Sequence, residues 1–414
     1  MSILSSWIAP HDPGRVLVDS PGGPITYGDL AAAIEEPVPA GAQVVMSPGT
    51  GRDEVVDLLR LSGRRQVVLI DRGLPAAERQ RRVEAAGAAR EREAATIVFT
   101  SGTTGPARAV RLTVANWRAA AAGSAAHLDH GPDDTWLAVM PLHHVGGLSI
   151  LYRSAYVGGR VRWVPGADPG RIAAELRSGV TMASLVPTVL RRVLDADSDS
   201  FSGLKAVLVG GGPISSGVLE AASARGLPVL PTYGMTETCA QVATLHPGSA
   251  PRPAAHPLPG IELRIAADGR IQVRGAQVSP GYADEDDRPT GAWFTTPDLG
   301  DLESDGALRV RGRADDVIVT GGENVWPGEV EEALVAHPAV RLAVVVGRPD
   351  PEWGEQVVAV YEGDPVGAGE LRQWLRPRLA PHQLPARVQR VERIPLNPTG
   401  KPDREAVRSL VRRD

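Results

Sequence analysis

Lysine is rare in this chain, and one of its two lysines stands where it could do chemistry. Lys and Arg together number 44, yet only Lys205 and Lys401 are lysines. Lys401 closes Asn397-Pro398-Thr399-Gly400-Lys401, a predicted tight turn ahead of a short basic helix. A lysine ammonium is a compact charge on a flexible stem, which suits it to meet an oxyanion as it develops. Chance can place a lysine in any turn, so the case for a catalytic Lys401 depends on the rest of the chain.

A loop rich in glycine and hydroxyl side chains follows the predicted buried strand Thr96–Phe99. In chain order its residues are Thr100, Ser101, Gly102, Thr103, Thr104 and Gly105. Glycine lets the backbone approach a ligand closely, and hydroxyl and amide groups can donate to phosphate oxygens. The loop lacks the Gly-Lys-Ser/Thr ending of a Walker A motif, and an ordinary surface turn can have the same composition. The stretch Gly210–Gly212 gives a weaker signal, because it lacks dinucleotide-binding spacing.

Two further segments carry side chains that suit a nucleotide. In Tyr-Gly-Met-Thr-Glu-Thr, Tyr233 can stack on a purine, Thr236 can donate to a phosphate and Glu237 can bind a hydrated Mg²⁺. A helix start with a threonine cap and a first-turn acid would look the same. Asp298, in Asp-Leu-Gly-Asp, can accept hydrogen bonds from both ribose hydroxyls, although turn chemistry is the alternative interpretation.

The elements that must position these residues alternate between residues 43 and 232. The predicted strands are Gln43–Met46, Gln66–Ile70, Thr96–Phe99, Trp136–Met140, Val161–Val164, Met182–Val186, Lys205–Val209 and Val229–Leu230. The predicted helices are Asp53–Leu61, Ala76–Ala86, Val114–Ala126, Leu148–Tyr156, Arg171–Arg177 and Ser216–Ala224. Strands that alternate with helices of this length predict βαβ units and largely parallel sheets, and therefore an α/β fold.

The pattern changes after about residue 258. Hairpin strands are predicted at Ile261–Ile265, Arg270–Arg274 and Leu308–Arg311, with turns at Asp268-Gly269 and Asp305-Gly306. A smaller α+β unit follows, with helices Pro327–Ala336 and Gly369–Leu379 and strands Leu342–Val346 and Val357–Tyr361. We expect an N-terminal ATP- and acyl-binding body over residues 1–312, partly hairpin or barrel-like, and a small mobile lid domain over residues 313–414.

Composition excludes several classes of function. The chain is 43% hydrophobic and 22% charged, as in ordinary soluble proteins, and its net charge of −5 favours neither nucleic acid nor an anionic membrane as partner. Cys239 is the sole cysteine, which excludes an intramolecular disulfide and a cysteine-based metal site. The start lacks the pattern of a signal peptide, and no long apolar run suits a membrane span. We expect a cytoplasmic protein without membrane insertion.

The separate motifs together resemble one superfamily, the adenylate-forming enzymes, which includes acyl-CoA synthetases, luciferases and adenylation domains. In the superfamily's order, the matching segments are Thr100–Gly105, Tyr233–Glu237, Thr296–Gly300, Gly312–Asp316, Gly321–Glu331 and Pro398–Lys401. The resemblance spans residues 96 to 414, and six ordered motifs make it specific. It implies a two-step reaction that uses ATP, Mg²⁺ and coenzyme A. A carboxylate attacks the α-phosphate to give an acyl-adenylate and pyrophosphate, and a thiol then displaces AMP.

The resemblance also implies roles for individual residues. Thr100–Gly105 would hold the β- and γ-phosphates, and Tyr233 and Gly234 would pack on adenine beside Gly211 and Gly212. Thr236 and Glu237 would serve phosphate and Mg²⁺, while Asp298 and Arg313 would hold the ribose. Lys401 would bridge the carboxylate and the α-phosphate in the transition state. Asp315 matches the hinge of the lid, and Gly322 would border the pantetheine tunnel, where a side chain would block the thiol.

The chain departs from the superfamily pattern in two places. After Gly105 the usual sequence is Lys-Pro-Lys-Gly, whereas this chain has Pro-Ala-Arg-Ala, so Arg108 is a candidate to replace one lysine as a phosphate contact. The region before residue 90 is shorter than in most members. We expect a trimmed N-terminal subdomain with fewer strands or more reliance on a homodimer.

The segment from Pro141 to Ser154 lies where the superfamily builds its acyl pocket. With the segments around Ser184, Tyr233 and Gly321, it most resembles the o-succinylbenzoate–CoA ligases of menaquinone biosynthesis, which act on an aryl carboxylate with a second carboxylate. Small residues would admit the ring, His144 would lie near the reacting carboxylate, and a guanidinium would attract the unreacted one. The candidates are His144, Gly146, Gly147, Ser149, Arg153, Thr238 and Gln241. For His143, His144 and Arg153, packing or a structural ion pair is the alternative.

Other functions stay open at this point. One is a different aryl or medium-chain acyl-CoA synthetase, or a stand-alone adenylation enzyme that loads a carrier protein. Another is a non-catalytic homologue that binds nucleotide or acyl ligand. The non-catalytic alternative is disfavoured by the presence of Lys401, Glu237, Asp298 and Arg313. The altered Pro106–Ala109 stretch is the only sequence feature that favours it.

Overall fold

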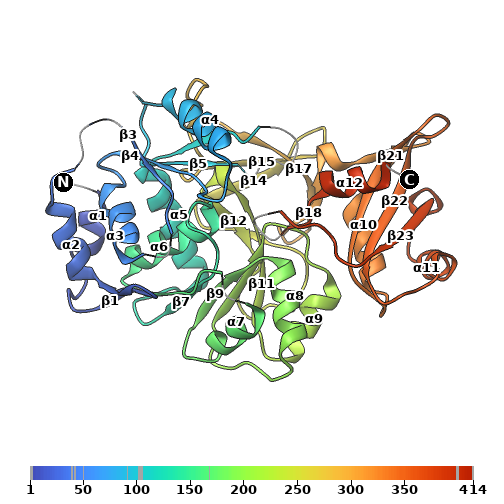
Figure 1. Cartoon of the computed structure of the whole chain (residues 1–414), viewed down its shortest axis with the longest axis horizontal. Helices are drawn as coiled ribbons and strands as arrows, with labels where there is room; N and C mark the ends of the chain where they lie inside the picture. The colour runs from blue at the N-terminus through green and yellow to red at the C-terminus, as the bar shows by residue number, and fades with distance from the viewer. Residues whose placement is uncertain are drawn as a thin grey trace.

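The computed structural model describes residues 3–38, 41, 43–49, 51–90, 92–100, 106–166, 168–397 and 401–412. Figure 1 shows a large body, coloured blue to yellow, and a smaller C-terminal part in orange and red beside it. Three sheets lie in the body and one in the C-terminal part. Among the described residues, none of the helices has both the length and the apolar character needed to cross a bilayer.

A nine-stranded sheet forms the centre of the body. In spatial order its strands are His256–Pro257 (β13), Ala240–Thr244 (β12), Val229–Met235 (β11), Ala206–Gly210 (β10), Met182–Leu185 (β9), Thr135–Ala138 (β7), Arg160–Trp163 (β8), Val16–Ser20 (β1) and Gly23–Thr26 (β2). The strands from β11 to β1 run parallel to one another. In β10, Ala206 and Leu208 face one core while Val207 and Val209 face another, as strand alternation requires. Helices therefore cover both faces.

A second, five-stranded sheet carries the predicted phosphate loop. Its strands in spatial order are Gly281–Tyr282 (β16), Ala109–Leu112 (β6), Thr96–Phe99 (β5), Gln66–Leu69 (β4) and Gln43–Met46 (β3). The strands β3, β4 and β5 run parallel, and β6 returns antiparallel to β5. The chain between β5 and β6 contains the loop, of which Ser101 to Gly105 lie outside the described residues.

Helices flank the two body sheets. Their bounds are Ile3–Ile8 (α1), Tyr27–Glu35 (α2), Arg52–Leu61 (α3), Ala76–Gly87 (α4), Val114–Leu128 (α5), Val145–Val157 (α6), Pro169–Leu176 (α7), Pro187–Ala196 (α8) and Ser216–Ala224 (α9). Helices α7, α8 and α9 pack on one face of the nine-stranded sheet. Helices α5 and α6 lie in the core that both sheets share.

The remaining two sheets are built mainly from hairpins. The four-stranded sheet contains Ile261–Ile265 (β14), Arg270–Gly275 (β15), Phe294–Leu302 (β17) and Leu308–Arg313 (β18). The C-terminal sheet contains Glu323–Val325 (β20), Ile318–Thr320 (β19), Gly354–Gly363 (β22), Val340–Asp350 (β21) and Arg387–Val391 (β23). Helices Pro327–Val335 (α10), Ala368–Leu375 (α11) and Arg404–Arg412 (α12) accompany the C-terminal sheet. The predicted α/β fold with an α+β C-terminal part is confirmed.

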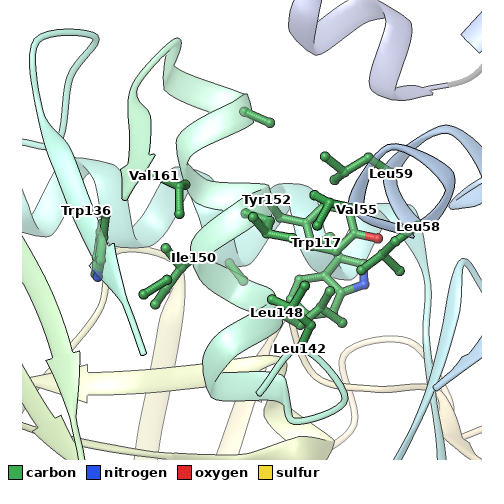
Figure 2. Close-up of a cluster of buried hydrophobic side chains, with 14 of the residues drawn as sticks. Val55, Leu58, Leu59, Trp117, Trp136, Leu142, Leu148, Ile150, Tyr152 and Val161 are labelled. Atoms are coloured by element: carbon green, nitrogen blue, oxygen red, sulfur yellow. The ribbon is translucent and has the colours of Figure 1, made fainter. Parts of the chain in front are cut away.

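A cluster of large side chains fixes helix α6, which begins after His144. Trp117 of α5 stacks on Tyr152 of α6 with ring centroids 4.4 Å apart, and Leu58 and Leu59 of α3 lie in the same buried cluster (Figure 2). Burial of each such side chain contributes about 2 kcal/mol. The three helices are thereby held as one unit, which gives the residues of α6 a rigid support.

His130 should make the protein sensitive to acid. Its side chain is 5% exposed and neither ring nitrogen has a hydrogen-bond partner among the described residues. Burial lowers the pKa of His130 from 6.5 to about 4, although Asp134 opposes this and Arg153 and Lys205 add to it. The unfolded chain therefore takes up a proton first as the pH falls, so stability is full above pH 6.5 and is lost toward pH 4. This group accounts for about 3 kcal/mol.

Urea unfolding of the wild type and of His130→Leu at several pH values between 7.5 and 4.5 checks this expectation. The free energy of unfolding should fall less steeply with pH in the variant. A His382→Leu variant, in the C-terminal part, controls for the added leucine. Equal slopes in His130→Leu and the wild type would contradict the assignment.

Candidate active site

The side chain of Lys401 lies at the C-terminal edge of the central sheet. Gly211, directly after β10, has a φ of +81°, and a Cβ built on it would lie 2.8 Å from Cε and 3.1 Å from Nζ of Lys401. The positive φ favours glycine at this position, and any larger residue would also have to displace the end of the lysine side chain. Ligands of open parallel sheets bind outside the carboxyl ends of the strands, which is where this lysine reaches.

Two hydrogen bonds hold the turn that presents Lys401. The Asn397 amide donates to the Lys401 carbonyl at 2.8 Å, and the Lys401 amide donates to Asn397 Oδ1 at 3.1 Å. Burial lowers the pKa of the Lys401 ammonium, Arg313 lowers it further, and the charge of Asp298 raises it. The lysine is half-buried among charged groups of the body. Residues 398–400 of the predicted turn lie outside the described residues.

Asp298 lies within strand β17 and not in a turn, so the turn interpretation of this residue was wrong. Tyr233 donates its phenol hydrogen to Asp298 Oδ2 at 2.8 Å, and Asp298 stands opposite Arg313 in the β17–β18 pairing. Burial raises the pKa of Asp298, against the opposing effects of Tyr233 and Arg313. Arg313 Nε is buried without a hydrogen-bond partner in the described part of the chain. The structure thus brings together Tyr233, Asp298, Arg313 and Lys401.

Thr236 and Glu237 lie in a tight turn at the end of β11. They belong to the 3₁₀ segment Thr236–Thr238, and both are half-buried. Gly234 is needed before this turn, because a Cβ there would lie 1.7 Å from the Ala240 carbonyl oxygen. Directly after it, Cys239 and Ala240 both have positive φ, 55° and 75°, which costs energy for residues with a side chain. This strained turn presents Glu237 beside the Tyr233–Asp298 pair.

Arg108 is engaged by protein groups in this structure. Its guanidinium lies 3.3 Å from the centre of the Tyr282 ring and forms an ion pair with Glu285. Its backbone amide donates to Thr100 Oγ1 at 3.0 Å, which ties it to the start of the predicted phosphate loop. A direct phosphate contact by Arg108 stays a prediction.

His144 reaches the site from the other side. Its Nε2 atom is buried without a hydrogen-bond partner among the described residues, and its ring lies 4.3 Å from that of His143. Burial lowers the pKa of His144 to about 3, and the charges of His143 and Lys401 act in the same direction. The ring is therefore neutral at pH 7, and it lies close enough to Lys401 for the lysine charge to oppose its protonation. His143 in turn lies 3.7 Å from an oxygen of Asp71.

A stripe of predicted pocket residues runs along helix α6. Gly146, Ser149 and Arg153 are spaced three and four residues apart, so they share one helix face. Ser149 donates its hydroxyl to the Gly146 carbonyl at 3.0 Å, and a Cβ at Gly146 would approach Met140 Cε to 3.3 Å. Gly147 has a structural role, because a Cβ there would lie 2.4 Å from the Pro141 carbonyl oxygen. Gly147 thus permits close packing at the start of α6.

Arg153 is a buried guanidinium without an anion. Its side chain is 3% exposed, and its Nε and Nη2 atoms have no hydrogen-bond partner among the described residues. It lies 5.6 Å from the centre of the Trp136 ring and near the buried Cys239 thiol. Burial lowers the pKa of Arg153 to about 10, so it is still charged at pH 7. An unpaired buried charge is costly, which makes an ordinary structural ion pair an inadequate explanation.

Four other predicted residues are not brought to Lys401. The Thr238 hydroxyl bonds to the backbone of Met235 and Ala240, and the Gln241 amide bonds to Ser124 and Thr244. Both residues are buried supports of the turn. Gly322 lies in the exposed β19–β20 hairpin, where a Cβ would meet no atom, and Asp315 is exposed in the 3₁₀ segment Ala314–Asp316. The roles of Gly322 in passage of the thiol and of Asp315 in lid rotation stay predictions.

Sequence reasoning missed two residues beside Glu237. Tyr282 donates its phenol hydrogen to Glu237 Oε1 at 2.7 Å. Arg288 has a buried Nη1 without a partner in the described ranges, and it lies over the Phe294 ring at 4.5 Å. Burial lowers its pKa, while Tyr282, Glu285 and Glu237 raise it. Tyr282 follows a glycine, and Arg288 follows four acidic residues. Both patterns are also typical of ordinary loops, so the sequence alone did not indicate a role for either residue.

Family models match both parts of the chain. The model described as AMP-binding enzyme matches residues 39–283, and that of the AMP-binding enzyme C-terminal domain matches residues 329–401. The chain belongs to the AMP-binding enzyme family. The AMP-binding match includes β5, β11 and the turn with Glu237, and the C-terminal match ends at Lys401. The superfamily predicted from the six motifs is confirmed.

Individual relatives and solved structures agree with this family. The 2-succinylbenzoate–CoA ligase of Bacillus cereus is 39% identical over 339 residues, which are 77% of this chain and 70% of the relative. That of Bacillus cytotoxicus gives the same values. Among solved structures, the o-succinylbenzoate CoA synthetase of Bacillus subtilis in complex with the acyl-adenylate OSB-AMP is 29% identical, with a TM-score of 0.85 over 98% of both chains. The same enzyme in complex with ATP and magnesium is 28% identical, also with a TM-score of 0.85, over 98% of this chain and 99% of that chain.

Proposed function

We propose that this chain is an ATP-dependent o-succinylbenzoate–CoA ligase of menaquinone biosynthesis. It joins the acid to AMP with release of pyrophosphate and then exchanges AMP for the thiol of coenzyme A. The observation that carries the choice of acid is Arg153, whose buried guanidinium has no anionic partner among the described residues and which shares a helix face with Gly146 and Ser149. The unreacted carboxylate of a dicarboxylate would supply the missing charge. Family relatives with this named activity support the same choice.

The residues around Lys401 suit a magnesium nucleotide. Asp298 presents a carboxylate for ribose hydroxyls, Arg313 offers an unpaired N–H, and Glu237 offers a single carboxylate at the strained turn. Within the described ranges no group of three or more His, Cys, Asp or Glu side chains could hold a metal ion. This fits Mg²⁺, which keeps several waters and takes one or two carboxylates beside substrate phosphates. Lys401 would then stabilise charge that develops between the acid and the α-phosphate.

The lid orientation suits the first half-reaction. Lys401 reaches Gly211 of the body, while Gly322 is exposed and a Cβ built on it would meet no atom within 4 Å. Ser216 of the body donates to Glu332 Oε1 of α10 at 3.0 Å, which links the two parts in this orientation. We place the hinge at Asp315, the body at residues 1–312 and the lid at residues 313–414. Rotation about Asp315 would bring Gly322 to the path of the thiol. We also place the enzyme in the cytoplasm, with a homodimer as its candidate assembly.

A substrate panel tests the proposed function. Coenzyme A–dependent AMP release from ATP and Mg²⁺ would be measured with o-succinylbenzoate, benzoate, salicylate and octanoate. The proposal predicts a strong preference for o-succinylbenzoate. Preferred turnover of another acid would keep the ligase and refute the substrate, and ATP binding without turnover of any acid would favour the non-catalytic alternative.

Asp298→Asn should weaken the interaction with ATP selectively. The amide keeps the size of the side chain but loses one acceptor oxygen and the negative charge that faces Arg313 and Tyr233. We expect the KM for ATP to rise roughly 10- to 100-fold, as for loss of hydrogen bonds to a charged group, and the KM for the acid to change little. Initial rates with each substrate varied in turn would measure both. Asp301→Asn, three residues along the same strand, removes a surface partner of Arg311 and is the matched control. Equal rises in both variants would contradict the role.

A further inference from the structure

Glu237 is held by a side chain that comes from a different sheet. Tyr282 Oη donates to Glu237 Oε1 at 2.7 Å, and the Tyr282 side chain is 9% exposed. The second carboxylate oxygen, Oε2, has no hydrogen bond from the described part of the chain. One oxygen of the Glu237 carboxylate is therefore held by a protein hydrogen bond, and the other is available to a ligand.

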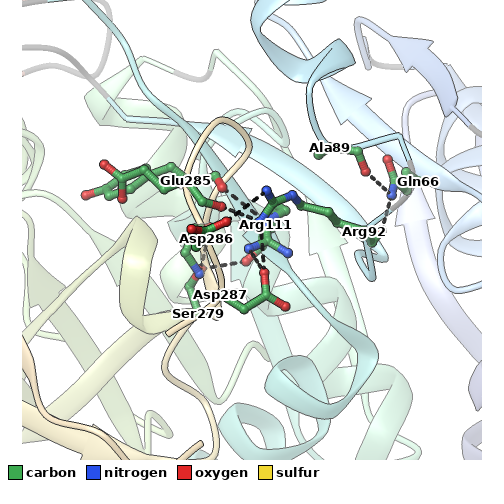
Figure 3. Close-up of polar contacts among 10 residues, drawn as sticks. Gln66, Ala89, Arg92, Arg111, Ser279, Glu285, Asp286 and Asp287 are labelled. Carbon is green, nitrogen blue, oxygen red and sulfur yellow. Dashed lines mark hydrogen bonds and ion pairs between the residues drawn. The ribbon is translucent and has the colours of Figure 1, made fainter. Parts of the chain in front are cut away.

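Tyr282 is itself fixed from the backbone. It pairs with Val110 where β16 meets β6, the strand that follows the predicted phosphate loop. The fully buried Arg111 donates from Nε to the Tyr282 carbonyl at 3.1 Å. Arg111 also forms an ion pair with Asp287 (Figure 3). Arg92 approaches the same acidic loop, with 3.2 Å to Asp287. The backbone at Tyr282 is therefore held by its pairing with β6 and by the Arg111 guanidinium.

The ring of Tyr282 is held by Arg108. The guanidinium lies 3.3 Å from the ring centre, and Glu285 of the acidic loop forms an ion pair with it. A cation over an aromatic face is attracted by the ring electrons, and a positive neighbour also strengthens the phenol as a hydrogen-bond donor. The contacts run in sequence from Glu285 through Arg108 and Tyr282 to Glu237.

We propose that Tyr282 is a positioning residue for Glu237, and that Arg108 acts through Tyr282 and not by binding a phosphate. The proposal rests on the proposed function in one respect, the assignment of Glu237 to Mg²⁺. Free rotation of Glu237 would present either oxygen, or neither, to the metal. The phenol restricts the carboxylate to one arrangement and so lowers the entropy lost when Mg²⁺ and nucleotide bind.

The test is direct binding of nucleotide with and without metal to Tyr282→Phe. Phenylalanine keeps the ring under Arg108 and removes only the hydroxyl, so the fold should be retained. By calorimetry, we expect the Kd of ATP with Mg²⁺ to rise about 10-fold and the Kd of ATP in EDTA to change less than twofold. Pyrophosphate exchange should need about 10-fold more Mg²⁺ for half-saturation, with the acid KM unchanged.

Tyr361→Phe is the matched control, because among the described residues the Tyr361 hydroxyl bonds only to Val366, in the C-terminal part. It should leave all these values as in the wild type. Unchanged Mg²⁺ dependence in Tyr282→Phe, or equal weakening of ATP with and without Mg²⁺, would overturn the positioning role. The calorimetry uses no carboxylic acid substrate. Its result can therefore be interpreted even if o-succinylbenzoate is not the substrate.

A double-mutant cycle tests the part played by Arg108. If Arg108 acts through Tyr282, then Arg108→Ala weakens ATP only when Mg²⁺ is present, and adding Tyr282→Phe causes little further loss. If Arg108 binds a phosphate, Arg108→Ala weakens ATP in EDTA as well, and the two losses add. The second pattern would refute the indirect role of Arg108.

Discussion

Lys401→Ala is expected to lower the rate of acyl-adenylate formation about 10³-fold, the scale seen when a group that stabilises developing charge is removed. The lysine lies against Gly211 and close to Asp298, Arg313 and His144, so its ammonium is placed within the site. The second half-reaction, thiol attack on an adenylate made beforehand, should change much less. The lysine belongs to the proposed lid, whose rotation would carry it away before that step.

Lys205→Ala is the matched control for Lys401→Ala, because it makes the same substitution at the only other lysine of the chain. Lys205 Nζ donates to the Asp129 carbonyl at 2.6 Å and pairs with Asp134 at 3.0 Å, away from the site. Single-turnover rates of both half-reactions would be measured for both variants. The account predicts loss of the first half-reaction in Lys401→Ala alone. Equal loss of both half-reactions in Lys401→Ala, or equal effects of the two lysine variants, would contradict it.

Arg153→Met is expected to weaken binding of o-succinylbenzoate and at the same time to increase the stability of the fold. Methionine has a similar length and no charge, so the variant loses the attraction for the unreacted carboxylate. The KM for o-succinylbenzoate should rise on the order of 100-fold, and the KM for ATP should change less than twofold. The free energy of unfolding should rise by about 1–4 kcal/mol, because an unpaired buried charge is replaced by an apolar side chain.

Analogues of the acid make the Arg153 test specific. 4-Oxo-4-phenylbutanoate lacks the ring carboxylate, and 2-butanoylbenzoate lacks the aliphatic one. Only the analogue that keeps the reacting carboxylate should be a substrate, and its KM should be nearly the same in the wild type and in Arg153→Met. A rise in KM that is equal for the dicarboxylate and this analogue, or equal for acid and ATP, would refute the assignment.

Motifs at strand ends were the most predictable part of the site. Strands β3 and β5 have the predicted bounds, because each is a short apolar run followed directly by turn residues. Parallel strands bring their carboxyl ends to one edge, so Gly211 and Tyr233 meet there from neighbouring strands. The rarity of lysine singled out Lys401, and the resemblance supplied its role and that of Arg313; the two residues come from distant segments that no local pattern connects.

Other features depended on contacts between distant segments. Asp298 was open to interpretation as a turn residue, because Asp-Leu-Gly-Asp has turn composition, yet pairing with β15 and β18 makes it part of β17. The α8 helix was not predicted, since its apolar residues follow a buried strand and a proline without a break. The hydrogen bond from Tyr282 to Glu237 joins residues 45 apart in sequence, and no spacing rule reports it.

The central claim is that this chain makes an adenylate of o-succinylbenzoate and passes it to coenzyme A. The most direct measurement is mass spectrometry of the products that the purified protein forms from the acid, ATP and Mg²⁺, first without and then with coenzyme A. The account predicts the acyl-adenylate in the first incubation and AMP with the CoA thioester in the second, and neither product in Lys401→Ala. Absence of the acyl-adenylate from the wild-type incubation, with ATP bound, would contradict it.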